Sequence, residues 1–113
     1  MTVAEALRKA ADLIEPKGAW SRGTRFRNSR GVPLSSWEDP SAAVCYCAEG
    51  AIEAATGVRY SDAHRAFNTY LEAKCRPGIQ IWVWNDALSR TQSEVVAALR
   101  DCASQLDFAG VPA

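Results

Sequence analysis

The sequence predicts a mainly α-helical domain of the α+β class, with about four helices and a few short strands or a small hairpin. Four stretches carry apolar residues at helical spacing, residues typical of helix ends flank these stretches, and only two short stretches alternate as strands do. The 113 residues, 48% of them hydrophobic, suffice to bury one modest core. We therefore expect a single domain over residues 1–108, followed by a frayed tail at 109–113.

The first helix is expected over residues 2–15. Thr2 and Glu5 have the spacing of a capping box, in which each side chain binds the backbone amide of the other residue. Pro16 and Gly18 end the helix. Its apolar face comprises Val3, Ala6, Leu7, Ala10, Leu13 and Ile14.

Residues 17–39 contain several glycines and are predicted to hold one or two short strands. Thr24 and Phe26 alternate with Arg25 and Arg27, which gives the period of two expected of a strand. A loop then leads to the next helix.

The second helix is expected over residues 41–56, with Ser41 as N-cap and Gly57 as C-cap. Gly50 lies at the edge of a face of small apolar residues, which would let a backbone or an aromatic ring approach closely. Cys45 lies at the margin of this face and is expected to be the more exposed thiol of its region. The face itself comprises Val44, Cys47, Ala48, Ala51, Ile52 and Ala55.

Two further helices are expected at 62–75 and 92–106. Ser61 opens the first, and a second capping box formed by Thr91 and Glu94 opens the other. The apolar stripe of the last helix includes Cys102, which we expect to act as a small core residue.

Between these helices, residues 79–84 are the best strand candidate. The stretch is β-branched and aromatic, and Ile79, Ile81 and Val83 alternate. Asn85 and Asp86 would then form a turn.

The balance of charge limits the function classes. Thirteen basic residues match thirteen acidic ones, which argues against a protein whose whole surface binds nucleic acid. No apolar run is long enough to span a bilayer, and charged residues occupy the N-terminal stretch where a signal peptide would be apolar. These features predict a cytoplasmic protein with no membrane partner, in which the four cysteines are free thiols.

A metal site is not expected. Five side chains could each bind a soft ion: Cys45, Cys47, His64, Cys75 and Cys102. Cys45 and Cys47, however, are two positions apart on the expected helix and would project from nearly opposite sides, so they could not share an ion. The sequence contains no CxxC or HxxxH spacing. We therefore expect neither a metal nor another cofactor.

A cysteine-dependent hydrolase or transferase is an alternative. Cys47, His64 and then Asn85 or Asp86 follow the order nucleophile, base and orienting group found in papain-type enzymes. The thiol would be activated only if the helix began at Cys47. Because Ser41 is the stronger start signal, we expect Cys47 to pack in the core.

Binding is the expected function. Residues 17–30 hold five basic residues with Trp20 and Phe26 between them, and no acidic residue. Arginine and tryptophan are frequent anchors at protein interfaces, so a protein partner is expected first, with nucleic acid or phosphate contact as the alternative. The residues of this predicted contact surface are Trp20, Arg22, Arg25, Phe26, Arg27 and Arg30.

Three short motifs resemble those of a family of small uncharacterised bacterial and phage proteins, known only as a domain of unknown function. They are Cys47-x-x-Gly50-Ala51, Trp84-Asn85-Asp86-Ala87 and Arg90-Thr91-Gln92-x-Glu94-Val95. The resemblance covers roughly residues 4–106. It implies a cytosolic accessory protein of bacterial or prophage origin, and no particular reaction or cofactor.

Overall fold

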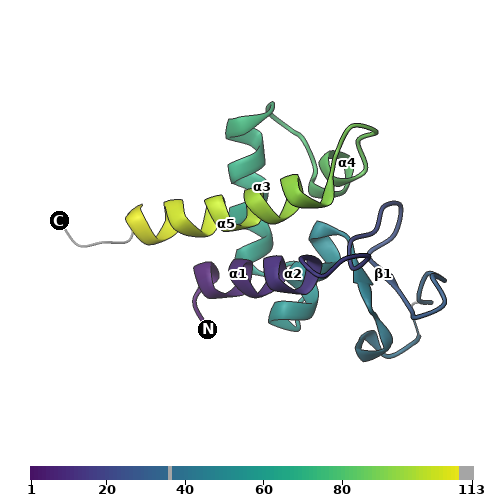
Figure 1. Cartoon of the computed structure of the whole chain (residues 1–113). Coiled ribbons are helices and arrows are strands. Elements are labelled where there is room, and N and C mark those ends of the chain that lie inside the picture. Colours follow the sequence, from purple (N-terminus) through teal and green to yellow (C-terminus); the bar gives the residue numbers. More distant parts are fainter. Residues whose placement is uncertain (36, 110–113) are drawn as a thin grey trace.

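In the residues that the structure describes, five α-helices and a small two-stranded antiparallel hairpin confirm the predicted α+β class (Figure 1). The computed structural model describes residues 1–35 and 37–109. The predicted frayed tail therefore lies outside the described residues, apart from Ala109, which ends the last helix. The elements are α1 (Val3–Ile14), β1 (Phe26–Arg27), β2 (Cys45–Tyr46), α2 (Ala48–Thr56), α3 (Asp62–Lys74), α4 (Ile81–Asn85) and α5 (Gln92–Ala109).

The first and last helices form the long side of the molecule. They run antiparallel along one another in Figure 1, and an ion pair joins Arg8 of α1 to Asp107 near the end of α5. The predicted capping box of Thr2 and Glu5 is confirmed. So is that of Thr91 and Glu94 at the start of α5.

The second helix begins later than the sequence predicted. Cys47, not Ser41, is its N-cap, and Gly57 at φ +75° is its C-cap, as predicted. Ser41 lies in a short 3₁₀ helix at Pro40–Ala42, where Asp39 accepts a hydrogen bond from its amide. A helix does begin near Ser41, but it is a single 3₁₀ turn and not the start of α2. The chain then becomes extended in β2 and leaves Val44 exposed instead of on the packing face.

The predicted strand at 79–84 is also wrong, because most of this stretch forms α4. Ile81, Trp84 and Asn85 are buried, at the i, i+3, i+4 spacing of a helix. Trp82, on the opposite side, is 54% exposed. Asn85 is thus the last residue of a helix, and Asp86 is its C-cap.

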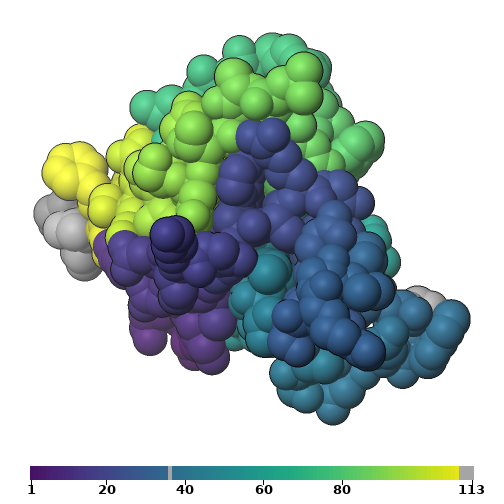
Figure 2. Space-filling model, turned by 45° about the vertical axis from the view of Figure 1, so that its right-hand side comes forward, coloured from purple at the N-terminus to yellow at the C-terminus, as the bar shows by residue number. Residues whose placement is uncertain are grey.

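The hairpin lies at the end of the molecule opposite the C-terminus of α5 (Figure 1). β1 pairs with β2, while Trp20 bridges to the free side of β2 and Pro33 to that of β1. Residues 28–35 and 37–44, which we call the lobe, connect the two strands. Figure 2 shows the lobe in blue, projecting from the helical body at the lower right.

The core fills the space among the helices. Its largest fully buried side chains include Leu7 and Ile14 of α1, Ile52 of α2, Phe67 of α3 and Leu99 of α5. Cys102 is buried in this core, as predicted. No helix in the described part of the chain is both long and apolar enough to cross a membrane.

Candidate functional site

The N-terminus of α2 brings together three of the predicted site residues. The thiol sulfur of Cys47 accepts a hydrogen bond from the amide of Gly50 at 3.3 Å. The side-chain oxygen of Asn85 accepts one from the amide of Ala48 at 3.0 Å. Asp86 adjoins them, since its Oδ1 accepts a hydrogen bond from the Asn85 amide group at 2.9 Å. Two of the amides that a helix start leaves without backbone partners are therefore satisfied by side chains.

Asn85 also fixes the segment that leads into β1. The Trp20 indole donates to its oxygen at 2.8 Å, and its amide group donates to the Ser21 carbonyl at 3.1 Å. Asp86 holds the same segment one step further on, by accepting from the Gly23 amide at 3.1 Å. Asn85 is fully buried, so the Trp20 indole and the Ser21 carbonyl would both lose the partner that it provides if it were replaced.

Gly50 allows this segment to lie directly against α2. A Cβ atom at position 50 would lie 2.1 Å from the carbonyl oxygen of Arg25 and 2.8 Å from its carbon. The predicted close approach at this glycine is confirmed, and it is made by a backbone. The Cys47 amide donates to the same carbonyl oxygen at 3.1 Å.

The environment of the Cys47 thiol opposes ionisation. Only 4% of the residue is exposed, and burial raises the pKa of its thiol to about 11. The hydrogen bond from Gly50 acts in the opposite direction, while the carboxylates of Glu49 and Asp86 raise the pKa further. A helix start at Cys47 places the thiol where a nucleophile belongs, but its desolvation disfavours the thiolate that such chemistry needs. Cys45, half-buried, is the more exposed of the two thiols, as predicted.

Glu49 is a residue of this region that the sequence reasoning overlooked. Its side chain is only 10% exposed, and its Oε1 lies 3.9 Å from Nε2 of His64. The ring of Tyr60 meets that of His64 edge-on, with the centroids 5.3 Å apart. The signal in the sequence was an acidic residue in a first helical turn, which usually indicates only a favourable contact with the helix dipole.

The predicted basic contact surface is mostly engaged within the protein. Phe26 is buried, and Arg25 forms an ion pair with Glu53. Arg27 donates to the carbonyls of Arg22 and Gly31. Arg25 thus joins the segment before β1 to α2, and Arg27 joins the segments on either side of β1, which leaves few of their donors for a partner.

The other two arginines of that surface differ from each other. The Arg22 guanidinium donates to the carbonyls of Leu88 and Arg90, and it lies over the Trp20 ring. Arg30 is exposed on the turn at 28–31 and forms no ion pair with a described residue. Of the four arginines in the predicted surface, Arg30 is exposed, whereas Arg22, Arg25 and Arg27 are half-buried.

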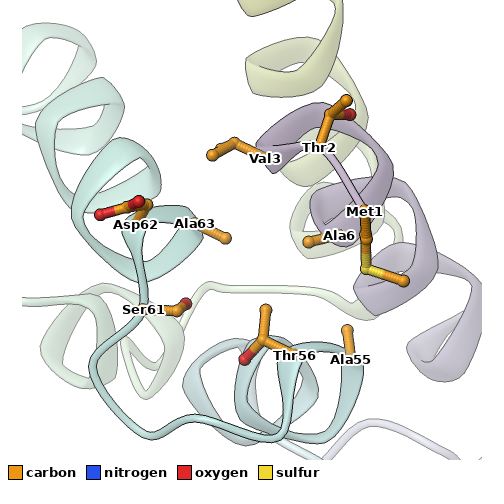
Figure 3. Close-up of a pocket in the computed structure, with 9 residues that line it drawn as sticks. All are labelled: Met1, Thr2, Val3, Ala6, Ala55, Thr56, Ser61, Asp62 and Ala63. Carbon is orange, nitrogen blue, oxygen red and sulfur yellow. The ribbon is translucent and has the colours of Figure 1, made fainter.

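A cavity of about 330 Å³ opens elsewhere, where α1 and α3 begin and α2 ends (Figure 3). Thr2 and Ser61 line it, but their hydroxyl groups already cap the two helices. Asp62, also in its wall, pairs with Arg65. In the described part of the chain, no three His, Cys, Asp or Glu side chains converge as metal ligands would.

The motifs that suggested a family thus have structural roles at one junction. Cys47 and Gly50 position the start of α2, Asn85 and Asp86 hold the segment before β1, and Arg90 donates to the Trp84 carbonyl at 3.0 Å. No curated protein and no solved structure shows detectable similarity to the chain. The family model described as a family of unknown function, DUF6197, matches residues 1–105, and the chain belongs to that family.

Proposed function

We propose that the protein acts by binding a protein partner, and that the lobe makes the contact. The observation that carries this proposal is Trp37, which is 85% exposed on a turn of the lobe. Tryptophan is among the side chains that contribute most to protein interfaces, because it buries a large area and loses little conformational freedom. A tryptophan that contacts so little of its own protein is available for such a role.

Other apolar side chains of the lobe are exposed in the same way. Val32 is 51% exposed and Val44 is 48% exposed. Single exposed apolar residues are common, but three within one short segment of the chain support a role in contact with a partner. The proposed contact therefore lies further along the chain than the predicted one, at Val32, Trp37 and Val44. Arg22, Arg25 and Arg27 of the predicted surface act as supports.

The base of the lobe is held firmly, which lowers the entropic cost of binding through it. The Val44 amide donates to the Arg27 carbonyl at 2.9 Å, and the Leu34 amide donates to the Phe26 carbonyl at 3.1 Å. Across the turn at 28–31, the Asn28 amide donates to the Val32 carbonyl at 2.9 Å.

Affinity capture with paired tryptophan variants tests the proposal. Immobilised wild-type protein, Trp37→Ala and Trp82→Ala are exposed to the same lysate, and the retained proteins are identified by mass spectrometry. Trp82 is the matched control, because it is an exposed tryptophan on α4, outside the lobe. We expect a protein that wild type and Trp82→Ala retain and Trp37→Ala loses. Identical retention by all three proteins would refute the role of the lobe.

The same proposal places the protein in the cytoplasm of a bacterium or of a cell carrying a prophage. Its support is the family resemblance of the sequence and the four free cysteines, one of which, Cys75, is exposed. Exposed free thiols persist in a reducing compartment. Fractionation of the source cells with an antibody to the protein provides the test.

A further inference from the structure

Resting on the proposed function, we infer that the partner of the lobe offers an apolar pocket bordered by lysine or arginine side chains. The inference comes from the charges beside Trp37. Glu38 and Asp39 follow it directly, and both are exposed. The exposed aromatic side chain is therefore followed directly in the chain by two exposed acidic residues.

These carboxylates are not neutralised by the protein itself. Neither forms an ion pair with a described residue. Each accepts only a local backbone hydrogen bond, Glu38 from the Ser35 amide at 3.1 Å and Asp39 from the Ser41 amide at 2.9 Å. The bonds to Ser41 lower the pKa of Asp39, so that this carboxyl group stays ionised well into the acidic range.

The positive charge of the lobe lies on a different turn. Arg30 occupies the turn at 28–31, whereas Trp37, Glu38 and Asp39 follow Leu34 on the way to the 3₁₀ helix. The charges nearest to Trp37 in the chain are therefore both negative. Negative charges at the border of the partner's pocket would repel Glu38 and Asp39, whereas lysine or arginine side chains there would attract them. A basic border is therefore the complementary one.

Isosteric variants test the effect of the two charges without removing the hydrogen bonds that hold this turn. Glu38→Gln and Asp39→Asn remove both negative charges but keep an oxygen that can accept from the Ser35 and Ser41 amides. Arg30→Gln removes the positive charge from the other turn and serves as the matched control. Circular dichroism and thermal melting should show that the double variant Glu38→Gln, Asp39→Asn and the control Arg30→Gln are folded like wild type.

The experiment measures the affinity of the purified protein recovered by Trp37-dependent capture, by isothermal titration in NaCl from about 50 to about 500 mM. We expect the double variant Glu38→Gln, Asp39→Asn to bind about twofold to thirtyfold more weakly than wild type at low salt and to lose most of the salt dependence. Arg30→Gln should bind as well as wild type or more tightly.

The outcomes distinguish the two proposals. Loss of binding in Trp37→Ala together with unchanged binding by the double variant would overturn the basic border and leave the lobe as the contact. Weaker binding by Arg30→Gln would overturn it as well, since it would indicate an acidic partner surface. If no protein depends on Trp37 for capture, the proposed function itself fails. A nucleic acid recovered in place of a protein would also refute it.

Discussion

The side-chain oxygen of Asn85 lies 3.0 Å from the amide nitrogen of Ala48, although 37 positions separate the two residues in the chain. This bond makes the end of α4 a cap for the start of α2. The Trp20 indole donates to the same oxygen, so that one buried amide side chain joins three segments. The lobe follows this junction in the chain, because the segment that Asn85 holds leads into β1.

Replacement of Asn85 by alanine should therefore be severely destabilising. The Ala48 amide and the Trp20 indole would each lose the partner that Asn85 provides, and an unsatisfied buried group costs about 1–3 kcal/mol. We expect the free energy of unfolding to fall by about 3 kcal/mol, as measured by denaturant titration. Asn68→Ala is the control, because Asn68 is half-buried and donates to Glu72 and to the Ile79 carbonyl. A loss no larger than that of Asn68→Ala would contradict the capping role.

Gly50→Ala should also destabilise the protein, against the usual trend. Alanine normally stabilises a helix interior by about 1 kcal/mol relative to glycine. Here the new Cβ would meet backbone atoms of Arg25, the nearest at 2.1 Å, which only a shift of the hairpin can relieve. We expect a net loss of at least about 2 kcal/mol. The reverse change Ala54→Gly, on the same helix, measures the propensity contribution alone, and a stabilised Gly50→Ala protein would refute the close contact.

The helices could be predicted where the signals were local. Caps and apolar stripes gave α1 and α3 to within one residue and gave the start of α5, since each involves positions only three or four apart. The end of α5 was predicted at residue 106, but the helix continues to Ala109. The start of α2 could not be predicted in this way. Pairing of Cys45 and Tyr46 with β1, about twenty residues earlier, keeps the chain extended up to Cys47. Nothing between Ser41 and Cys47 encodes that pairing.

The error at α4 has a similar cause. β-branched and aromatic residues favour a strand, but tertiary contacts override this preference. Only a helical turn presents Ile81 and Trp84 to the core and Asn85 to α2 together. The alternative enzyme hypothesis grouped Cys47 with Asn85 or Asp86, and these residues do lie together at the start of α2. The sequence could not predict that Asn85 caps the Ala48 amide and that Asp86 accepts from Asn85, because these bonds depend on distances across the fold.

Alkylation should rank the four thiols by burial. With a pKa of about 11, Cys47 is ionised to about one part in a thousand at pH 8, so it should react slowly with iodoacetamide. Exposed Cys75 should react fastest and half-buried Cys45 next. Peptide mass spectrometry gives the rate at each site, and the unfolded protein provides the common reference. Faster labelling of Cys47 than of Cys45 would revive the enzyme hypothesis.

Stability should fall in alkaline solution as these buried thiols ionise. Burial raises the pKa of both Cys47 and Cys102 from the ordinary 9.0 to about 11. Below pH 9 both states keep the protons and the full stability is present. Between pH 9 and 11 the unfolded chain releases protons that the folded protein retains, so the free energy of unfolding falls as pH rises, by up to about 1.4 kcal/mol per pH unit for each thiol.

Denaturant titrations from pH 8 to 11 measure this slope. The double variant Cys47→Ser, Cys102→Ala should show a flatter profile than wild type, because it lacks both groups. The pKa of Tyr70 is also raised, mainly by burial and by its hydrogen bond to Asp101, and both of these causes are the same in the two proteins. Parallel profiles would contradict the inferred shifts.

The Gln92 side chain should stabilise the protein by donating hydrogen bonds at the C-terminal end of α1. Its side-chain amide donates to the carbonyls of Ile14 and Pro16, at 2.6 and 2.7 Å, and the last turn of α1 contains no basic residue to interact with these groups. Gln92→Glu keeps the shape but replaces two donor hydrogens with a negative charge beside the negative end of the helix dipole. We expect the free energy of unfolding, measured by denaturant titration, to fall by about 2 kcal/mol at pH 7 and by less near pH 4, where the new carboxyl group is partly protonated.

Gln105→Glu is the control, at an exposed site on α5 where the side chain donates to Asp101, and it should lower the free energy of unfolding by less than about 1 kcal/mol. Equal losses at the two positions would show that Gln92 does not cap α1.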